Sequence, residues 1–301
     1  MSNRLELLVP VVVWEIAKPL LITVVILLPM LVVGVILGRR KRRYLALTDD
    51  PFTDLPLRPP GESLRARIDA LSDTYDEKLF GTAVVGAVAI ALYDTIPHQV
   101  MPLACYAGLV IAAYLYFGRD LLRIARQIWD YRLGYKGERV VAEELNQLTA
   151  AGFRVFHDLP FDGFNVDHVI VGVPGVYVVE TKTRRKPTNV TGVERATVTF
   201  DGTMLKFPNG ATAEPLEQAR RNAKAVSAWL SKATGEPVFA GAIVTLPGWW
   251  VDRRARGDVN VLNPVEVKHS FPTRPNNPLS AEQIQRIAHQ ITERCRMTLA
   301  A

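Results

Sequence analysis

Three charged side chains flank an apolar stretch in the middle of the chain. Asp167 lies just before VIVGVPGVYVV, and Glu180 and Lys182 follow it. Charges are depleted in strands and costly to remove from water, so these positions need a chemical reason. Two converging carboxylates repel each other unless a cation lies between them, and Mg²⁺ favours one or two carboxylates with waters and phosphate oxygens. The pattern predicts a divalent metal site formed by Asp167 and Glu180.

Lys182 would lie beside that metal. Its ammonium group could stabilise a pentavalent phosphorane or orient an attacking water, which is the chemistry of metal-assisted phosphodiester hydrolysis. The alternative is a lateral salt bridge between Glu180 and Lys182 on a solvated strand edge, with Asp167 capping a strand, because loose motifs match by chance. The apolar strand before Glu180 favours a site, since sites in α/β domains lie where buried strands end.

The shared site depends on the turn between the two strands. A two-residue loop at Pro174 and Gly175 places Asp167 opposite Lys182, whereas a four-residue loop, residues 172–175, places it opposite Glu180. Either register puts the three side chains on one face, and a three-residue loop would send Asp167 to the other face. An even-length loop is therefore required.

Periodicity and turn residues predict a mixed α/β domain around this hairpin. The order is helix, three strands, hairpin, helix, two strands and helix. The expected elements are a helix over 119–134 that continues or restarts through 137–150, a strand at 153–158, a loop at 159–165, the strands around 169–179, a hairpin at 196–207, a helix at 214–232, strands at 238–246 and 258–263, and a helix at 280–297 with a capping box of Ser280 and Gln283.

The first third of the chain predicts membrane-spanning helices. Residues 19–37 carry no charge and approach the roughly 20 residues that cross a bilayer. They end in GRRKRR rather than in a cleavage site, which favours a retained anchor over the alternative of a secretory signal. Residues 79–93 and 100–117, separated by a polar break at 94–99, predict a helical hairpin, although 79–93 could instead be re-entrant or interfacial.

Charge sets the expected orientation and organisation. Basic residues follow the first and last apolar segments, so both flanks should be cytoplasmic, as in a multi-pass protein of the bacterial inner membrane. The chain carries a net charge of +6 at pH 7. Its basic carboxy-terminal part suits a polyanionic partner or, alternatively, the inner leaflet of the lipid bilayer. The expected domains are an anchor at 1–43, a cytoplasmic linker at 44–78 with a short helix at 63–78, the hairpin at 79–117 and a cytoplasmic domain at 118–301.

Three stretches of the soluble part together resemble a known family. They are GYKGERVVAEEL, GFRVFHDLPFDGFNVDHVIVGVPGVYVVETKT and EPLEQARRNAKAVSAWL. This combination resembles the nuclease-related domain, NERD, a branch of the PD-(D/E)xK nuclease superfamily, over about residues 130–245. The resemblance implies a restriction-endonuclease-like mixed sheet flanked by helices, in which Asp167 and Glu180 bind the metal and Lys182 assists catalysis. It also implies that Glu138 is an accessory acidic residue and that Gln218 points into the site.

Several of these residues have a second interpretation. Glu138 begins a helix and could simply complement the helix dipole. Gln218 could be an ordinary exposed helix residue. His168 faces away from Asp167 in a regular strand, which favours a packed core histidine over a ligand. Asn165 favours an Asx turn over a phosphate contact.

Basic and aromatic residues near the site could grip nucleic acid or could be ordinary surface and core residues. The expected phosphate contacts, which could equally form a solvated face, are Arg184, Arg185, Lys186, Arg220, Arg221 and Lys224. The segment GWW at 248–250, followed by DRRARGD, suits stacking on single strands or a membrane interface, with core packing as the default.

The sequence thus predicts a membrane-anchored nuclease that uses Mg²⁺ or Mn²⁺ to hydrolyse nucleic acid, with DNA favoured. The alternative is a catalytically inactive, membrane-tethered DNA-binding or protein-scaffold module that retains the nuclease-like fold, because fold does not establish activity.

Overall fold

A computed structural model describes residues 21, 28, 32–40, 43, 56–93, 103–271 and 278–296. Contacts divide the chain into two compact units. The first comprises Met1–Thr53 and Ala70–Ile128, and the second comprises Asp54–Asp69 and Trp129–Ala301. Part of the expected linker, residues 54–69, therefore groups with the carboxy-terminal domain.

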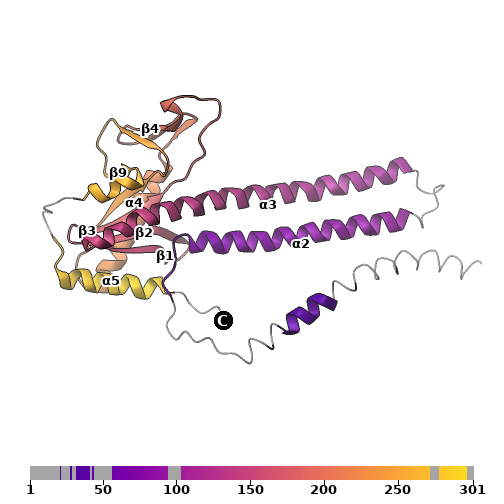
Figure 1. Cartoon of the computed structure of the whole chain (residues 1–301), viewed down its shortest axis with the longest axis horizontal. Coiled ribbons are helices and arrows are strands. Elements are labelled where there is room, and N and C mark those ends of the chain that lie inside the picture. The colour runs from indigo at the N-terminus through magenta and orange to yellow at the C-terminus, as the bar shows by residue number, and fades with distance from the viewer. Residues whose placement is uncertain are drawn as a thin grey trace, which may run out of the picture. The chain divides into compact units, whose positions relative to one another are not determined.

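Two long helices contribute to both units (Figure 1). Helix α2 spans Glu62–Tyr93, so the short helix expected at 63–78 and the apolar segment 79–93 form one continuous helix. Helix α3 spans Leu103–Asn146 and continues past Gly137 without a break. Within the first unit, Lys78 of α2 forms an ion pair with Asp120 of α3. The expected polar break at 94–99 lies outside the described residues.

The apolar content of the described helices supports fewer spans than expected. In the described parts of the chain one helical stretch, Ala104–Ala151, is long and apolar enough to cross a membrane. The expectation of about three spans is therefore not supported. The expected first span, residues 19–37, lies largely outside the described residues. The described segment 32–40, which overlaps the end of this span, is helical.

A five-stranded mixed sheet forms the centre of the second unit. Its strand order is β1-β2-β3-β7-β9, in which β1, β2 and β3 are antiparallel neighbours and β3, β7 and β9 are parallel. The bounds are Arg154–Phe161 for β1, Phe164–Gly172 for β2, Gly175–Thr181 for β3, Ala240–Thr245 for β7 and Val259–Leu262 for β9. The strands expected at 153–158, 238–246 and 258–263 are thus present.

Alternating side chains of this sheet pack against helices on both faces. On one face, Val169 and Val178 pack with apolar residues of α4, Glu214–Thr234, and α5, Ala281–Cys295. On the other, Ile170 and Val179 pack with residues of α3 and of the 3₁₀ helix Gln147–Ala151. Because neighbours along a strand point to opposite faces, a hairpin with both faces buried is a nearly continuous apolar run.

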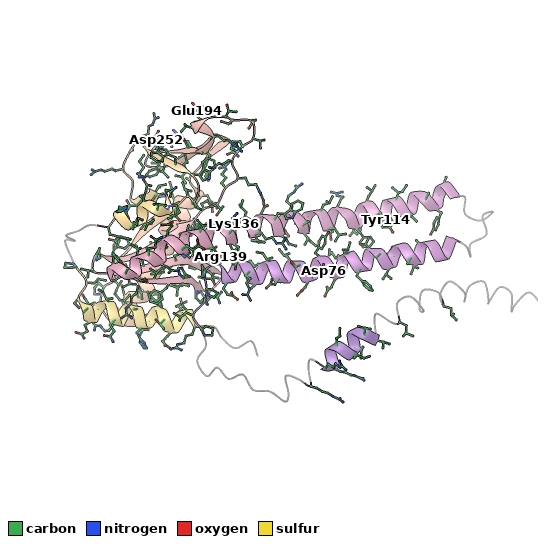
Figure 2. All side chains as sticks on the ribbon, viewed as in Figure 1. Asp76, Tyr114, Lys136, Arg139, Glu194 and Asp252 are labelled. Atoms are coloured by element: carbon green, nitrogen blue, oxygen red, sulfur yellow. The ribbon has the colours of Figure 1, made fainter. Side chains whose placement is uncertain are left out.

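A second, smaller sheet is formed by strands that alternate along the sequence with the later strands of the central sheet. Its strand order is β6-β5-β4-β8, with bounds Thr197–Phe200 for β4, Leu205–Phe207 for β5, Gly210–Thr212 for β6 and Trp250–Arg253 for β8. The hairpin expected at 196–207 is formed by β4 and β5. Figure 2 shows Glu194 and Asp252 at this sheet.

The connection between β1 and β2 differs from the expected loop. Residues 159–165 were expected to be irregular, but β1 continues through Phe161, which pairs with Phe164 across a turn of Asp162 and Gly163. Gly163 has a φ of +82°, a conformation that glycine adopts without steric cost. The two strands are therefore one hairpin, and Asp158 lies inside β1 rather than at its end.

Candidate functional site

The pairing of β2 with β3 brings the two predicted metal ligands together. Gly172 pairs with Gly175 and His168 with Val179, and the same register places Asp167 opposite Glu180. This is the register expected for the four-residue loop, but Gly172 and Gly175 themselves pair, so the turn consists of the two residues Val173 and Pro174. Residues directly opposite in an antiparallel pair share a face, so both carboxylates lie on the same side of the sheet, where β3 ends.

The Asp167 carboxylate of β2 forms a hydrogen bond with the backbone at the end of β3. Its Oδ2 accepts a hydrogen bond of 2.7 Å from the backbone N–H of Thr181. Burial raises the pKa of Asp167 to about 7, and this hydrogen bond opposes the rise in part. Ionisation of this carboxylate is therefore costly unless a neighbouring cation compensates for it.

Glu180 is more deeply buried, with only 3% of its surface exposed. Its Oε2 accepts a hydrogen bond of 2.9 Å from Nδ2 of Asn222. Burial raises the pKa of Glu180 well above its ordinary value, and the neighbouring Asp167 raises it further. The two carboxylates therefore interact, and a cation between them would relieve their repulsion.

Lys182 lies near both carboxylates, since its charge lowers the pKa of each. Its Nζ forms an ion pair of 2.7 Å with Oε2 of Glu214, at the beginning of α4. Both side chains are partly exposed, and exposed pairs contribute roughly 0–1 kcal/mol, so this ammonium group can exchange partners at little cost.

Glu138 supplies a third carboxylate from α3. It is 6% exposed, and its Oε2 is buried without a hydrogen-bond partner in the part of the chain that the structure describes. Burial, followed by the charges of Asp167 and Asp158, raises the pKa of Glu138 to about 9. A role limited to complementing the helix dipole does not explain this position, because Glu138 lies inside α3 and not at its first turn.

These donors fit a hard divalent cation. Mg²⁺ and Mn²⁺ favour carboxylate oxygens, and Oε2 of Glu138 is an acceptor that no group among the described residues satisfies. Among the described residues, no group of three or more His, Cys, Asp or Glu side chains has the geometry of a complete metal site. The protein could thus supply part of a coordination shell, and waters and substrate oxygens would supply the rest.

One face of α4 is turned toward these carboxylates. Glu214 contacts Lys182 and Asn222 contacts Glu180. Gln218 lies midway between them at four-residue spacing and is half-buried, so it shares their face of the helix. The sequence did not single out Asn222, although the same four-residue spacing from Gln218 could have indicated it.

Comparison with known families adds to this geometry. Residues 133–247 match the family model of the nuclease-related domain, NERD. The match begins within α3, ends after β7 and includes Glu138, Asp167, Glu180, Lys182 and Gln218. It supports the resemblance inferred from the three sequence stretches and indicates a nuclease-related fold. No curated protein and no solved structure matches the chain significantly.

The NERD region contains a further acidic residue that the sequence did not indicate. Asp158 of β1 is 1% exposed and has a φ of +50°, which is uncommon outside glycine. It lies opposite Asp167 in the β1–β2 register and raises the pKa of that neighbour. Asp158, Asp167 and Glu180 therefore follow one another across three adjacent strands. A carboxylate at the end of the strand expected at 153–158 was the available signal.

The two polar neighbours of Asp167 have structural partners. His168 is fully buried on the opposite face, where its ring nitrogens lie 2.9 Å from Nδ1 of His157 and 3.2 Å from Oγ1 of Thr181. It is thus a packed core histidine. The side-chain amide of Asn165 donates a hydrogen bond of 3.3 Å to Oδ1 of Asp158, so Asn165 has a partner within the domain.

Three of the predicted phosphate contacts have partners within the protein. Arg220 forms two hydrogen bonds of 2.7 Å with the Asp258 carboxylate. Arg221 approaches Glu217 at 3.9 Å on the same helix. Arg184 stacks over the Phe207 ring at 4.5 Å. These three cations thus already have contacts within the domain.

The other three predicted phosphate contacts are exposed. Arg185, Lys186 and Lys224 have no acidic partner among the described residues. Lys186 lies 5.8 Å from the centre of the Trp249 ring, which is itself buried in the core of the small sheet. Trp250, by contrast, is 69% exposed. The GWW segment therefore divides into one core residue and one surface aromatic.

Proposed function

We propose that the chain is a divalent-metal-dependent nuclease that hydrolyses phosphodiester bonds of nucleic acid, with DNA as the favoured substrate. The observation that carries the proposal is the placement of Asp167 opposite Glu180, with Lys182 beside them and the unsatisfied Oε2 of Glu138 nearby. A structural salt-bridge cluster would pair its carboxylates with cations. Here burial raises the pKa of all three carboxylates, and the charge of Asp167 raises the pKa of Glu138 and Glu180 further.

Each side chain has a role in this proposal. Asp167 and Glu180 hold Mg²⁺ or Mn²⁺, and Glu138 completes the acidic side of the site. The ion would polarise the phosphate and lower the pKa of a bound water. Lys182 leaves Glu214 and neutralises a phosphate oxygen as negative charge develops. Gln218 orients the water or the substrate from α4.

The same proposal includes the superfamily and the cellular location. The order α3, β1, β2, β3, α4, β7 suits a restriction-endonuclease-like core of the PD-(D/E)xK type. The apolar first part of the helix Ala104–Ala151 suits tethering to the bacterial inner membrane, with the domain at 118–301 in the cytoplasm. Tethering would confine cleavage to nucleic acid that approaches the membrane.

Purified full-length protein tests the proposal. We expect Mg²⁺- or Mn²⁺-dependent cleavage of DNA that is lost in Asp167→Asn, Glu180→Gln and Lys182→Met, while Arg286→Met, which breaks the exposed pair with Glu236, remains active. If the wild-type protein cuts neither DNA nor RNA with either ion, the nuclease proposal fails.

Two observations favour a second candidate, a catalytically inactive DNA-binding or scaffold module. Lys182 forms an ion pair with Glu214, and the described residues contain no complete three-ligand metal group. This candidate predicts salt-dependent DNA binding without cleavage, whereas a protein scaffold would show neither.

A further inference from the structure

A short segment outside the NERD match lies against the acidic site. Residues Arg58–Ser63 precede and begin α2, and they contact Asp158 across about 100 positions of sequence. Nε and Nη2 of Arg58 lie 2.6 and 2.5 Å from Oδ2 of Asp158. Ser63 donates its backbone N–H at 3.1 Å and its hydroxyl at 2.5 Å to the same carboxylate. Asp158 thus caps the beginning of α2.

The segment is also fixed at its other end. The backbone N–H of Arg58 donates to the carbonyl oxygen of Cys295 at 2.9 Å, and Leu57 forms a β-bridge with Arg296. Both partners lie at the end of α5. The segment is therefore held between β1 and α5 and is part of the domain, although it lies some 70 residues before the region that the family model covers.

Gly61 brings the backbone of this segment onto Glu138. Its φ of +75° is a left-handed conformation that favours glycine. A Cβ at Gly61 would lie 3.6 Å from Oε2 of Glu138 and would collide with the Tyr135 ring. The backbone of Gly61 also opposes, in part, the rise that burial causes in the pKa of Glu138. The segment thus reaches Glu138, whose buried Oε2 has no partner among the described residues.

We infer that Arg58 and Ser63 are positioning residues that hold the Gly61 backbone against Glu138 and thereby orient its free carboxylate oxygen toward a bound divalent cation. The inference rests on the proposed metal site. The contacts to Asp158 fix the segment, and the segment fixes Glu138. Loss of these contacts should weaken cation binding even though Arg58 and Ser63 touch no cation.

The direction in which cation affinity changes when Arg58 is removed distinguishes a positioning role from a purely electrostatic one. Arg58 is a cation near the acidic site, so its removal makes the site more negative and, by Coulomb attraction alone, would tighten cation binding. Removal of a positioning residue has the opposite effect, because groups that orient ligands typically change metal affinity about 10- to 100-fold.

Mn²⁺ binding to the full-length chain in detergent, measured by electron paramagnetic resonance of the free ion, tests the inference. We expect Arg58→Met to raise the Mn²⁺ Kd about tenfold. Arg58→Met also leaves Asp158 unpaired and could impair folding, so Ser63→Ala provides a milder variant that retains both charges. Its expected effect is a rise of about threefold. Arg58→Lys should fall between wild type and Arg58→Met, because lysine keeps the charge without the planar two-nitrogen contact.

A double-mutant cycle shows whether the effect passes through Glu138. In a Glu138→Gln background, Arg58→Met and Ser63→Ala should leave the Mn²⁺ Kd unchanged, since the group that they position is already altered. Arg286→Met, which breaks an exposed pair on α5, is the matched control and should bind as wild type does. Additive effects in the cycle, or an unchanged or lower Kd in both single variants, would overturn the inference.

Cleavage assays on the same samples distinguish this inference from the proposed function. Wild-type protein that binds Mn²⁺ with the expected cycle but cuts no nucleic acid would refute the nuclease proposal and leave the positioning role supported. Protein that cuts normally while its Mn²⁺ Kd is insensitive to Arg58 and Ser63 would refute only the positioning role. A wild-type protein that binds no Mn²⁺ would refute the positioning role as well.

Discussion

Asn222 of α4 donates a 2.9 Å hydrogen bond to Oε2 of Glu180, and both side chains are buried. This contact joins the helix that follows the hairpin to the carboxylate at the end of β3. Because Asn222 is four residues from Gln218 and eight from Glu214, the contact also determines that the face of α4 carrying these three residues is turned toward the carboxylates.

Asn222→Ala should therefore destabilise the domain by about 1–3 kcal/mol, because a buried carboxylate would lose its only side-chain hydrogen bond among the described residues. Urea denaturation of the purified protein measures the change. Lys224→Ala, an exposed position on the same helix, is the control and should alter stability by less than about 0.5 kcal/mol. Equal effects of the two substitutions would show that the hydrogen bond does not support Glu180.

The buried carboxylates should limit stability in the absence of metal. Asp167→Asn and Glu180→Gln keep an oxygen that can accept from Thr181 or Asn222 and remove a buried charge. In EDTA at pH 8 each variant should be more stable than wild type by about 1–3 kcal/mol. With Mg²⁺ the wild type should gain stability and the variants should not.

Parallel denaturation curves with EDTA and with excess Mg²⁺ check this pair of effects. Variants that are less stable than wild type in EDTA, or that keep the full Mg²⁺-induced gain, would contradict a cation site at these carboxylates.

The sequence was informative wherever the decisive interaction was local. The apolar run and its turn residues placed Asp167 on the same face as Glu180 and Lys182 but left two registers open, and the structure has the one in which Asp167 lies opposite Glu180. The Asp162-Gly163 turn carried an equally local signal, but residues 159–165 were interpreted as a loop because Pro160 interrupts the pattern. Proline is compatible with an edge strand such as β1.

The contacts that could not be predicted join distant parts of the chain. Arg58 and Asp158 are 100 positions apart, and their pairing depends on how α2 begins against β1. The Pro-rich composition of residues 55–62 is typical of a linker, and nothing in it specifies a docking partner. The orphaned oxygen of Glu138 likewise becomes visible only when α3 is placed beside the sheet.

Gly137 should be intolerant of any side chain. A Cβ at this position in α3 would overlap Oγ1 of Thr183, far inside van der Waals contact. Alanine usually stabilises a helix interior by about 1 kcal/mol relative to glycine, but here Gly137→Ala should destabilise by about 1–3 kcal/mol. Thermal melting measures the difference. Adding Thr183→Ala removes the overlapping atoms and should restore much of the loss; no recovery in the double variant would contradict this steric explanation.

The half-buried His157 should contribute a pH-dependent part of the stability. Burial lowers its pKa to about 4, against about 6.5 in an unfolded chain. The unfolded chain therefore binds a proton more readily, so this contribution is fully present above pH 6.5 and is lost as the pH falls toward 4. The loss in unfolding free energy between pH 7 and pH 5 should be smaller in His157→Gln by about 1–2 kcal/mol. Identical pH profiles would exclude His157 as the titrating group.

The exposed cations should dominate any contact with nucleic acid. Arg185, Lys186 and Lys224 have no acidic partner among the described residues, whereas Arg220 is held by Asp258. Each of Arg185→Ala, Lys186→Ala and Lys224→Ala should weaken DNA binding and reduce the slope of log Kd against log salt by about one. Arg220→Ala should leave that slope unchanged and lower stability instead. Fluorescence anisotropy across a salt series measures the DNA affinity of all four variants. A change in slope confined to Arg220→Ala would show that Arg185, Lys186 and Lys224 do not contact phosphates.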